Sequence, residues 1–369
     1  MDTRIEKLAN LLVNYSVNVK KGDKVLIRGD SSAAPLIKAV YKQVLWAGGH
    51  PLLRCTIPGL EEAFFKIAND EQIQYIHDPD RLAMNTYDVM ISLRAAENTR
   101  NLASIDAGKI VLQRRAMGEL MRTMLDRSAK GELRWTTTIF PTSAYAQDAD
   151  MSLDEYEDFY YGAVMPDMDD PIGYWQKVSA RQEKIIAWLK GKKKVHILGK
   201  KTDLQLSIEG RDFINCDCHL NVPDGEIFTG PVEDSVEGHV EFSYPAIYNG
   251  REVSGIKLWF EKGKVVKANA EKNEDMLQGL LDTDEGARYV GEFAIGTNSG
   301  IQQFTRQILF DEKIAGSFHM AVGSGYPESG SKNRSSIHWD MICDLRDGGE
   351  IWVDDEILYR NGDFVLFPG

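Results

Sequence analysis

Apolar positions in the first 140 residues follow two patterns in turn. Over residues 3–17 they recur three to four positions apart, which predicts an amphipathic helix. Short apolar runs and further helical patterns then alternate, predicting strands at 24–29, 51–57, 88–93 and 135–140 and helices at 33–47, 59–69 and 106–128. Because strands that alternate with helices pair in parallel, we expect an α/β N-terminal domain whose parallel sheet is flanked by helices.

The pattern changes in the second half of the chain. Residues 142–190 keep a helical pattern, acidic at first, and end in the glycine–lysine run 191–194, which is typical of a linker. From about residue 195 onward, apolar and polar residues alternate in short segments separated by glycine and asparagine turns. We therefore expect an α/β domain over 1–192 and an α+β C-terminal domain, rich in antiparallel strands and carrying the chemistry, over 193–369.

The amino-acid composition of the chain argues against several classes of function. The chain has 43 Lys and Arg against 56 Asp and Glu, a formal net charge of −13. This acidity argues against nucleic acid or anionic lipid as a partner, since phosphate groups require clustered cations. No apolar run approaches the roughly 18–20 residues that span a bilayer, the first residues lack a signal-peptide pattern, and four cysteines are too few for a disulfide scaffold. We expect a cytoplasmic protein without a membrane partner.

Several common catalytic signatures are missing from the sequence. The turn after the first predicted strand, 29–32, lacks the three-glycine dinucleotide fingerprint, and no Gly-Lys-Ser/Thr phosphate loop occurs. The chain also has no His-Glu-x-x-His helix, no Gly-x-Ser-x-Gly elbow and no paired Cys-x-x-Cys. A nucleotide site is therefore disfavoured, and a scaffold or dimerisation role is favoured for the N-terminal domain.

The strongest local signal lies at 336–342. Apolar residues alternate there with His338 and Asp340, so a strand would point both polar side chains to one face, about 6–7 Å apart. A neutral imidazole and a carboxylate are ligands that a borderline divalent ion accepts. The alternative is an edge strand with one solvated polar face.

Three further residues extend this set. His319 alternates with apolar residues in a segment rich in small residues, Glu292 lies within an apolar segment, and Glu226 precedes an apolar run. Each taken singly is also compatible with a core histidine or with a turn or surface acid. Buried carboxylates, however, are costly unless they are paired or bind a metal. Together with His338 and Asp340 the three form the inventory of a dinuclear hydrolase, whose ions lie about 3.5–4 Å apart.

Two other clusters compete with this set. Cys216-Asp217-Cys218-His219 resembles a metal-binding tract, but no second cysteine pair completes four ligands, so a strand with buried thiols is favoured. The segment 237–241 brings acids and a histidine together with period two. We expect these residues at most to lie next to the metal ligands, without binding the metal themselves.

Four stretches of the second half carry a family resemblance by their order and spacing: "NVPDGEIFTGP" (221–231), "GEFAIGTNSGI" (291–301), "LFDEKIAGSFHMAVGSGYP" (309–327) and "SSIHWDM" (335–341). They resemble the M29 metallopeptidases, the group of aminopeptidase T, AmpS and PepS. Residues 10–30 and 133–159 resemble the N-terminal domain of that family, so the resemblance covers most of the chain. The chain departs from the family in its shorter length, in a compressed stretch between Tyr326 and His338, and in "KIAGSFH" where an "NAACH"-like run is usual.

The resemblance implies a homodimeric aminopeptidase whose active sites face an enclosed space and favour short peptides. It also implies two divalent ions per chain, zinc, cobalt, manganese or magnesium, bound by Glu226, Glu292, His319, His338 and Asp340. Tyr326 would be a further ligand or a hydrogen-bond donor to the transition state. The ions would activate a water molecule that hydrolyses the N-terminal peptide bond. Glu292 is favoured as the bridging carboxylate, so Glu292 and Tyr326 are the expected catalytic residues.

Two rival functions remain open at this point. The 2,5-dihydroxypyridine dioxygenases resemble the same family and hold one ferrous ion, for which His319, His338 and Asp340 alone would suffice. That reading leaves Glu226 and Glu292 without a role as ligands. A non-catalytic binding protein on the same fold is the second rival.

Overall fold

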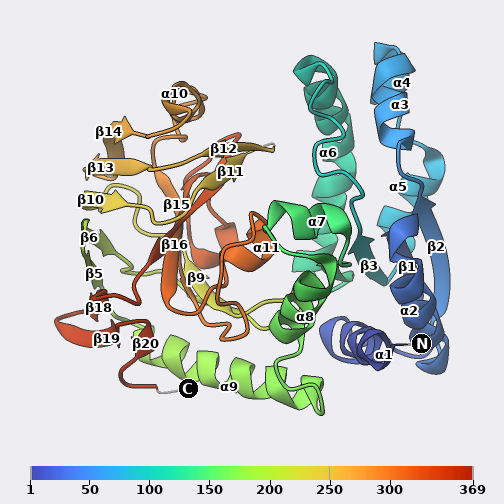
Figure 1. Ribbon diagram of the computed structural model, residues 1–369, viewed down its shortest axis with the longest axis horizontal. Coiled ribbons are helices and arrows are strands. Elements are labelled where there is room, and N and C mark those ends of the chain that lie inside the picture. The colour runs from blue at the N-terminus through green and yellow to red at the C-terminus, as the bar shows by residue number, and fades with distance from the viewer. Residues whose placement is uncertain (1, 249, 368–369) are drawn as a thin grey trace. The chain divides into compact units, whose positions relative to one another are not determined.

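The structure is a computed structural model that describes residues 2–248 and 250–367 (Figure 1). The chain forms two compact units. Unit 1 comprises Met1–Ile172 and Cys218–Pro223, and unit 2 comprises Gly173–Asp217 and Asp224–Gly369. Among the described residues, no helix combines the length and the apolar character needed to cross a bilayer.

Unit 1 contains a five-stranded parallel sheet in the order β2-β1-β3-β4-β8. Its strands are β1 (Lys24–Asp30), β2 (His50–Thr56), β3 (Val89–Arg94), β4 (Arg134–Ile139) and β8 (Asn221–Val222). Its helices are α1 (Thr3–Asn10), α2 (Ala34–Trp46), α3 (Leu60–Ile67), α4 (Asp70–Gln74), α5 (Asp78–Thr86), α6 (Ala107–Ala129), α7 (Ser143–Asp148) and α8 (Leu153–Val164). The α/β character predicted for this half is confirmed, and Leu26 and Met90 of adjacent strands pack with Leu120 and Met124 of α6.

Unit 2 is built from antiparallel strands, as predicted. One sheet has the order β17-β16-β15-β9-β7, a second has the order β14-β13-β10-β6-β5-β18-β19-β20, and β11 pairs with β12. The strands are β5 (Lys194–Gly199), β6 (Thr202–Ser207), β7 (Ile214–Cys216), β9 (Glu226–Thr229), β10 (Glu237–Glu241), β11 (Ala246–Tyr248), β12 (Arg251–Val253), β13 (Lys257–Glu261), β14 (Lys264–Asn269), β15 (Val290–Gly296), β16 (Ser317–Gly323), β17 (His338–Asp344), β18 (Glu350–Val353), β19 (Glu356–Arg360) and β20 (Asp363–Phe364). The helices α9 (Pro171–Leu189), α10 (Glu274–Leu281) and α11 (Ile308–Asp311) accompany them (Figure 1).

The division into units differs from the boundary expected at residue 192. Nearly all of α9 belongs to unit 2, because Ile185 and Leu189 on this helix are buried in the same core as the strands of unit 2. The short segment 218–223 belongs to unit 1, where β8 extends the parallel sheet beside β4. Neither feature is visible in a local pattern, since both depend on which core buries the apolar side chains.

Candidate metal centre

The five-stranded sheet of unit 2 gathers the predicted ligands on one face. Residues that lie directly opposite each other in a sheet share a face, and so do alternate residues of a strand. The register pairs Glu226 with Gly296, Ala294 with His319, Glu292 with Ala321, Ala321 with Asp340, and Gly323 with His338. The positions that pair directly with Glu226, Glu292, His319, Asp340 and His338 on the neighbouring strands include Gly296, Ala321, Ala294 and Gly323, and these small residues leave space for the large polar side chains.

The opposite face of the same strands is apolar and buried. Phe293, Phe318, Met320, Trp339 and Met341 alternate with the polar residues, and each is at most 2% exposed. The alternation predicted from the sequence thus holds both the core and the polar cluster in place. Glu226, Glu292 and His319 are buried as well, whereas His338 and Asp340 are half-buried.

Glu292 lies between two groups of ligand atoms. Its Oε1 is 3.6 Å from Nε2 of His319, and its Oε2 is 3.2 Å from Nε2 of His338. Glu226 completes the first group, with Oε2 3.5 Å from His319 Nε2, and Asp340 completes the second, with Oδ1 3.4 Å from His338 Nε2. In each group one ligand atom per residue lies within 4.8 Å of the other two. A single carboxylate is therefore shared by two possible ion sites.

Histidines and carboxylates of the cluster shift each other's pKa. Burial alone would lower the pKa of His319, but the carboxylates of Glu292 and Glu226 raise it to about 9. Burial would likewise raise the pKa of Glu292, whereas His319 and His338 lower it below its ordinary value. In the metal-free protein the imidazolium groups balance the carboxylates, and a metal ion has to replace their protons.

The chemistry of the donor set fits a divalent metal ion. Among the residues that the structure describes, both ring nitrogens of His319, Oε2 of Glu226 and Oδ1 of Asp340 are buried and make no hydrogen bond. Buried polar atoms normally find a partner, and the exceptions require an explanation such as an ion. Imidazole nitrogens and carboxylate oxygens are ligands that zinc and related ions accept.

Two charged residues in this cluster were not singled out from the sequence. Glu312 groups with His319 and Asp340, and Lys313 is fully buried beside Glu226 and Glu312. Burial raises the pKa of Glu312 to about 7. Burial would lower the pKa of Lys313, but neighbouring carboxylates raise it well above its ordinary value. Their sequence, two charges after a short helix, is typical of a solvated turn, and only the fold reveals their burial.

Tyr326 lies at the open side of the cluster. It is 41% exposed, and its ring lies 5.1 Å from the ring of His338 and 5.3 Å from that of Phe228. Reduced access to solvent and the carboxylates of Glu292 and Asp340 raise the pKa of its hydroxyl, so this group stays protonated at neutral pH. It can therefore donate a hydrogen bond.

The competing clusters do not assemble in the same way. Cys216 belongs to unit 2, where it groups with Asp224 and Glu226. His219 belongs to unit 1, with its ring 4.7 Å from that of Tyr15. His239 lies in the eight-stranded sheet, and among the described residues it joins none of the candidate metal groups.

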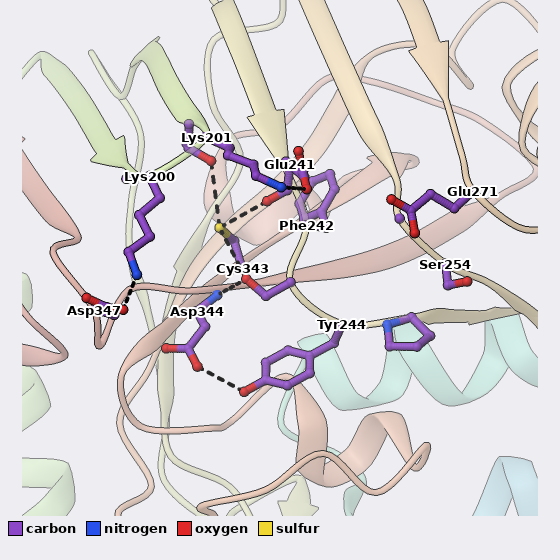
Figure 2. Close-up of a pocket in the computed structure, with 15 residues that line it drawn as sticks. Lys200, Lys201, Glu241, Phe242, Tyr244, Ser254, Glu271, Cys343, Asp344 and Asp347 are labelled. Atoms are coloured by element: carbon purple, nitrogen blue, oxygen red, sulfur yellow. Dashed lines mark hydrogen bonds and ion pairs between the residues drawn. The ribbon is translucent and has the colours of Figure 1, made fainter.

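A surface cleft of about 570 Å³ at the far end of β17 has a different character (Figure 2). Most of its charged side chains are already paired: Lys200 with Asp347, Lys201 with Glu241 at 2.6 Å, and Asp344 with the Tyr244 hydroxyl at 3.0 Å. Asp344 and Asp340 are four residues apart on an extended strand, about 13 Å. The cleft is therefore separate from the metal cluster and offers no comparable set of ligands.

Comparison with known proteins identifies the family. The sequence profile of the family described as thermophilic metalloprotease (M29) matches residues 1–364. The chain belongs to the M29 metallopeptidase family. This membership confirms the resemblance found in the sequence and the prediction of a metallopeptidase.

Curated relatives of this M29 chain extend over nearly its whole length. Aminopeptidase 2 from Geobacillus stearothermophilus is 27% identical over 427 aligned positions, covering 99% of this chain and 98% of the relative. Aminopeptidase T from Thermus thermophilus is also 27% identical, with 97% and 95% covered. Aminopeptidase AmpS from Bacillus subtilis is 27% identical, with 99% and 100% covered.

Solved structures share the fold. Wild-type AmpT from Thermus thermophilus matches with a TM-score of 0.86 at 24% identity, over 98% of this chain and 99% of AmpT, which confirms the predicted fold class. The 2,5-dihydroxypyridine dioxygenase from Pseudomonas putida KT2440 matches with a TM-score of 0.60 at 15% identity, over 98% and 96%. Both matches, at less than 25% identity, are likenesses of fold alone.

Proposed function

We propose that the protein is an aminopeptidase that uses two divalent metal ions to remove N-terminal residues from short peptides. The observation that carries the proposal is the position of Glu292, whose two oxygens face two separate histidines. Glu226 and His319 would hold one ion, and His338 and Asp340 the other, with Glu292 as the bridge. When bound, such a pair of ions supplies an activated water molecule and polarises the scissile carbonyl group.

The chain's own residues have distinct roles in this reaction. Glu292 positions both ion sites with respect to each other, and the alanines and glycines of the same sheet face leave room for the reacting bond. The Tyr326 hydroxyl donates a hydrogen bond to the carbonyl oxygen as negative charge develops on it.

The relatives' names and the site support this function over the iron dioxygenase alternative. The curated relatives are aminopeptidases, and the dioxygenase match is a likeness of fold at 15% identity. A mononuclear site of His319, His338 and Asp340 would leave Glu226 and Glu292 buried next to the ion without a role as ligands. Lys313 pairs with only one oxygen of Glu226, while the other oxygen of Glu226 and both oxygens of Glu292 face the histidines, so both carboxylates are better explained as ligands.

A homodimer is part of the proposal, supported by the surface of unit 1. Within the described sheet, β2 is an edge strand that pairs with β1 alone, and Leu52 and Leu53 on it are 45% and 40% exposed. Trp46 and Ile67 nearby in the sequence are 71% and 82% exposed. Exposed apolar side chains beside an unpaired strand edge are typical of association sites. A monomeric mass in light scattering at about 10 µM protein would contradict the dimer.

The proposed location is the cytoplasm. The four cysteines Cys55, Cys216, Cys218 and Cys343 form no disulfide, which fits a reducing compartment. Detection of the tagged protein in a membrane or secreted fraction would contradict this proposal.

The test of the function is a metal-reconstituted assay. Protein stripped with a chelator is reloaded with zinc, cobalt, manganese or magnesium and assayed on a panel of aminoacyl and dipeptide substrates, with elemental analysis of the same samples. We expect about two ions per chain and release of N-terminal residues. Full activity of the stripped protein, or one oxygen-sensitive iron per chain without peptidase activity, would overturn the proposal.

A further inference from the structure

Lys313 is a cation enclosed in the metal cluster. Its side chain is fully buried, and its ammonium lies 2.9 Å from Oε1 of Glu226 and 3.8 Å from Oδ1 of Asp224. It also donates a hydrogen bond to Glu312. A lysine is almost never fully buried unless its charge is paired, so these carboxylates are what hold it there.

A close approach of two backbone segments puts Lys313 in this position. A Cβ atom on Gly296, at the end of β15, would overlap the carbonyl oxygen of Ile314 and lie 2.9 Å from the carbonyl carbon of Lys313. The amide of Asn298 donates to the Lys313 carbonyl at 3.1 Å, and its side chain donates to the Asp224 carbonyl at 2.8 Å. These contacts tie the lysine to the strand pair that carries Glu226.

Because of Lys313, the two oxygens of Glu226 face different groups: one faces the lysine ammonium, and the other faces the proposed ion site. Oε1 accepts from the ammonium, while Oε2 lies 3.5 Å from Nε2 of His319 and makes no hydrogen bond among the described residues. Only Oε2 is therefore directed toward the ion site. The ammonium also lies beside Glu226 and Asp224, which together with Cys216 would otherwise form a further group of possible ligands.

The charge of Lys313 affects how strongly the carboxylates of the site repel one another and how strongly they bind metal ions. When all of them are ionised, Asp224, Glu226, Glu292, Glu312 and Asp340 carry five negative charges around the site. Two divalent ions and one lysine would carry five positive charges. In a buried site, an unbalanced charge is expensive and like charges repel strongly. The ammonium thus offsets carboxylate repulsion at all times and also repels an incoming ion.

We propose that Lys313 is a built-in cation of the metal centre: it stabilises the carboxylate cluster without metal and weakens binding of the ion held by Glu226 and His319. This inference rests on the proposed metal-dependent function. It makes the two ion sites unequal, with a tight site at Glu292, His338 and Asp340 and an exchangeable site beside the lysine. Lys313 is a positioning residue, since it acts through Glu226.

The experiment compares metal binding and stability in Lys313→Met, Lys313→Gln and Lys313→Arg. Lys313→Met removes the charge at similar length, Lys313→Gln keeps a donor without the charge, and Lys313→Arg keeps the charge. Metal-stripped and manganese-loaded forms are compared by thermal unfolding, and the stripped forms are titrated with Mn²⁺ in a calorimeter. Arg211→Met is the matched control, because Arg211 is a buried cation of the same unit whose partner is Glu233.

We expect loss of the charge to destabilise the stripped protein selectively. In Lys313→Met and Lys313→Gln, the rise in Tm on adding Mn²⁺ should exceed that of the wild type by at least about 5 °C. The weaker of the two binding events should tighten by about tenfold or more. Lys313→Arg should behave as the wild type, and Arg211→Met should lower Tm equally with and without metal.

Three results would overturn the inference while leaving the proposed function standing: equal loss of Tm, failure of rescue, and unchanged metal binding. An equal loss of Tm in the stripped and loaded forms of both uncharged variants would show a purely structural lysine, as would the failure of Mn²⁺ to rescue either variant. If the wild type itself binds no divalent ion, the proposed function fails and this inference fails with it. If the wild type binds manganese while both uncharged variants bind it unchanged, this inference fails and the function stands.

Discussion

The carbonyl oxygen of Ser324 lies 2.7 Å from Nδ1 of His338. The backbone oxygen can only accept, so Nδ1 carries the proton and donates it. That hydrogen bond fixes the imidazole so that Nε2 faces Glu292 and Asp340. The Ser324 amide in turn donates to the Ile337 carbonyl at 2.7 Å, which closes the loop between β16 and β17. The backbone therefore orients His338 before any ion arrives.

Replacing His338 should remove one ion and leave the other. In His338→Ala, Glu292 and Asp340 lose their imidazole partner, whereas Glu226 and His319 keep theirs. We expect elemental analysis to find about one ion per chain in place of about two, with peptidase activity lost. His196→Ala is the control, because His196 pairs with Asp203 in the other sheet of unit 2. A variant that keeps both ions would show that His338 is no ligand.

Replacing Glu292 should have a larger effect on metal content than replacing Glu226. The two oxygens of Glu292 face both histidines, whereas of the two histidines Glu226 faces His319 alone, and its other oxygen pairs with Lys313. Glu292→Gln should therefore release both ions under dialysis, and Glu226→Gln should release only one. Elemental analysis after dialysis gives the comparison. Equal metal content in the two variants would contradict a bridging carboxylate.

The candidate ligand residues could be proposed from the sequence because their pattern is local. His338 and Asp340 alternate with apolar residues of one strand, and the family motifs add Glu226, Glu292 and His319. Their convergence into one buried cluster follows from the strand order, which single-strand patterns do not contain. The burial of Lys313 in this cluster could not be predicted from the sequence for the same reason. A lysine beside a glutamate after a short helix is typical of a solvated surface, and only the approach permitted by Gly296 buries it.

Removing the hydroxyl of Tyr326 should slow the reaction without releasing metal. The ring packs on His338 and on Phe228, and a phenylalanine keeps both contacts. We expect Tyr326→Phe to lower kcat by about 10²–10³-fold with little change in KM, as for loss of one donor to a developing oxyanion. Tyr248→Phe, at a half-buried tyrosine packed on Trp339, is the control. Loss of an ion from Tyr326→Phe would assign the hydroxyl as a ligand instead.

Asp284 should make stability depend on pH in acid. The burial cost of its carboxylate is outweighed by hydrogen bonds from the Ser336 amide and hydroxyl, the Ser335 hydroxyl and the Gly286 amide, which lower its pKa to about 2. A carboxyl with a lowered folded pKa contributes stability that is present above its unfolded pKa of about 3.9 and is lost as the pH falls toward 2.

We therefore expect Asp284→Asn to lower the free energy of unfolding by about 1–2 kcal/mol at neutral pH, after allowance for solvent screening. The difference from the wild type should stay constant above about pH 5 and shrink below about pH 4. Urea unfolding of both proteins across this range measures it. A difference that grows toward acid would show that the carboxylate is not the stabilising form. Because Ser335 and Ser336 lead into β17, the same variant should also weaken Mn²⁺ binding.

Gly296 should be intolerant of even one added methyl group. A Cβ at this position would overlap the Ile314 carbonyl oxygen, which is backbone and cannot rotate away. The segment that carries Lys313 would have to move away from β15 and from the paired strand that holds Glu226. We expect Gly296→Ala to cost about 1–3 kcal/mol of stability and to weaken Mn²⁺ binding in calorimetry. Gly279→Ala is the matched control, because a Cβ there meets nothing within 4 Å inside α10 and should stabilise the helix by up to about 1 kcal/mol. If both alanine variants retain wild-type stability and metal affinity, the close contact at Gly296 does not position the lysine.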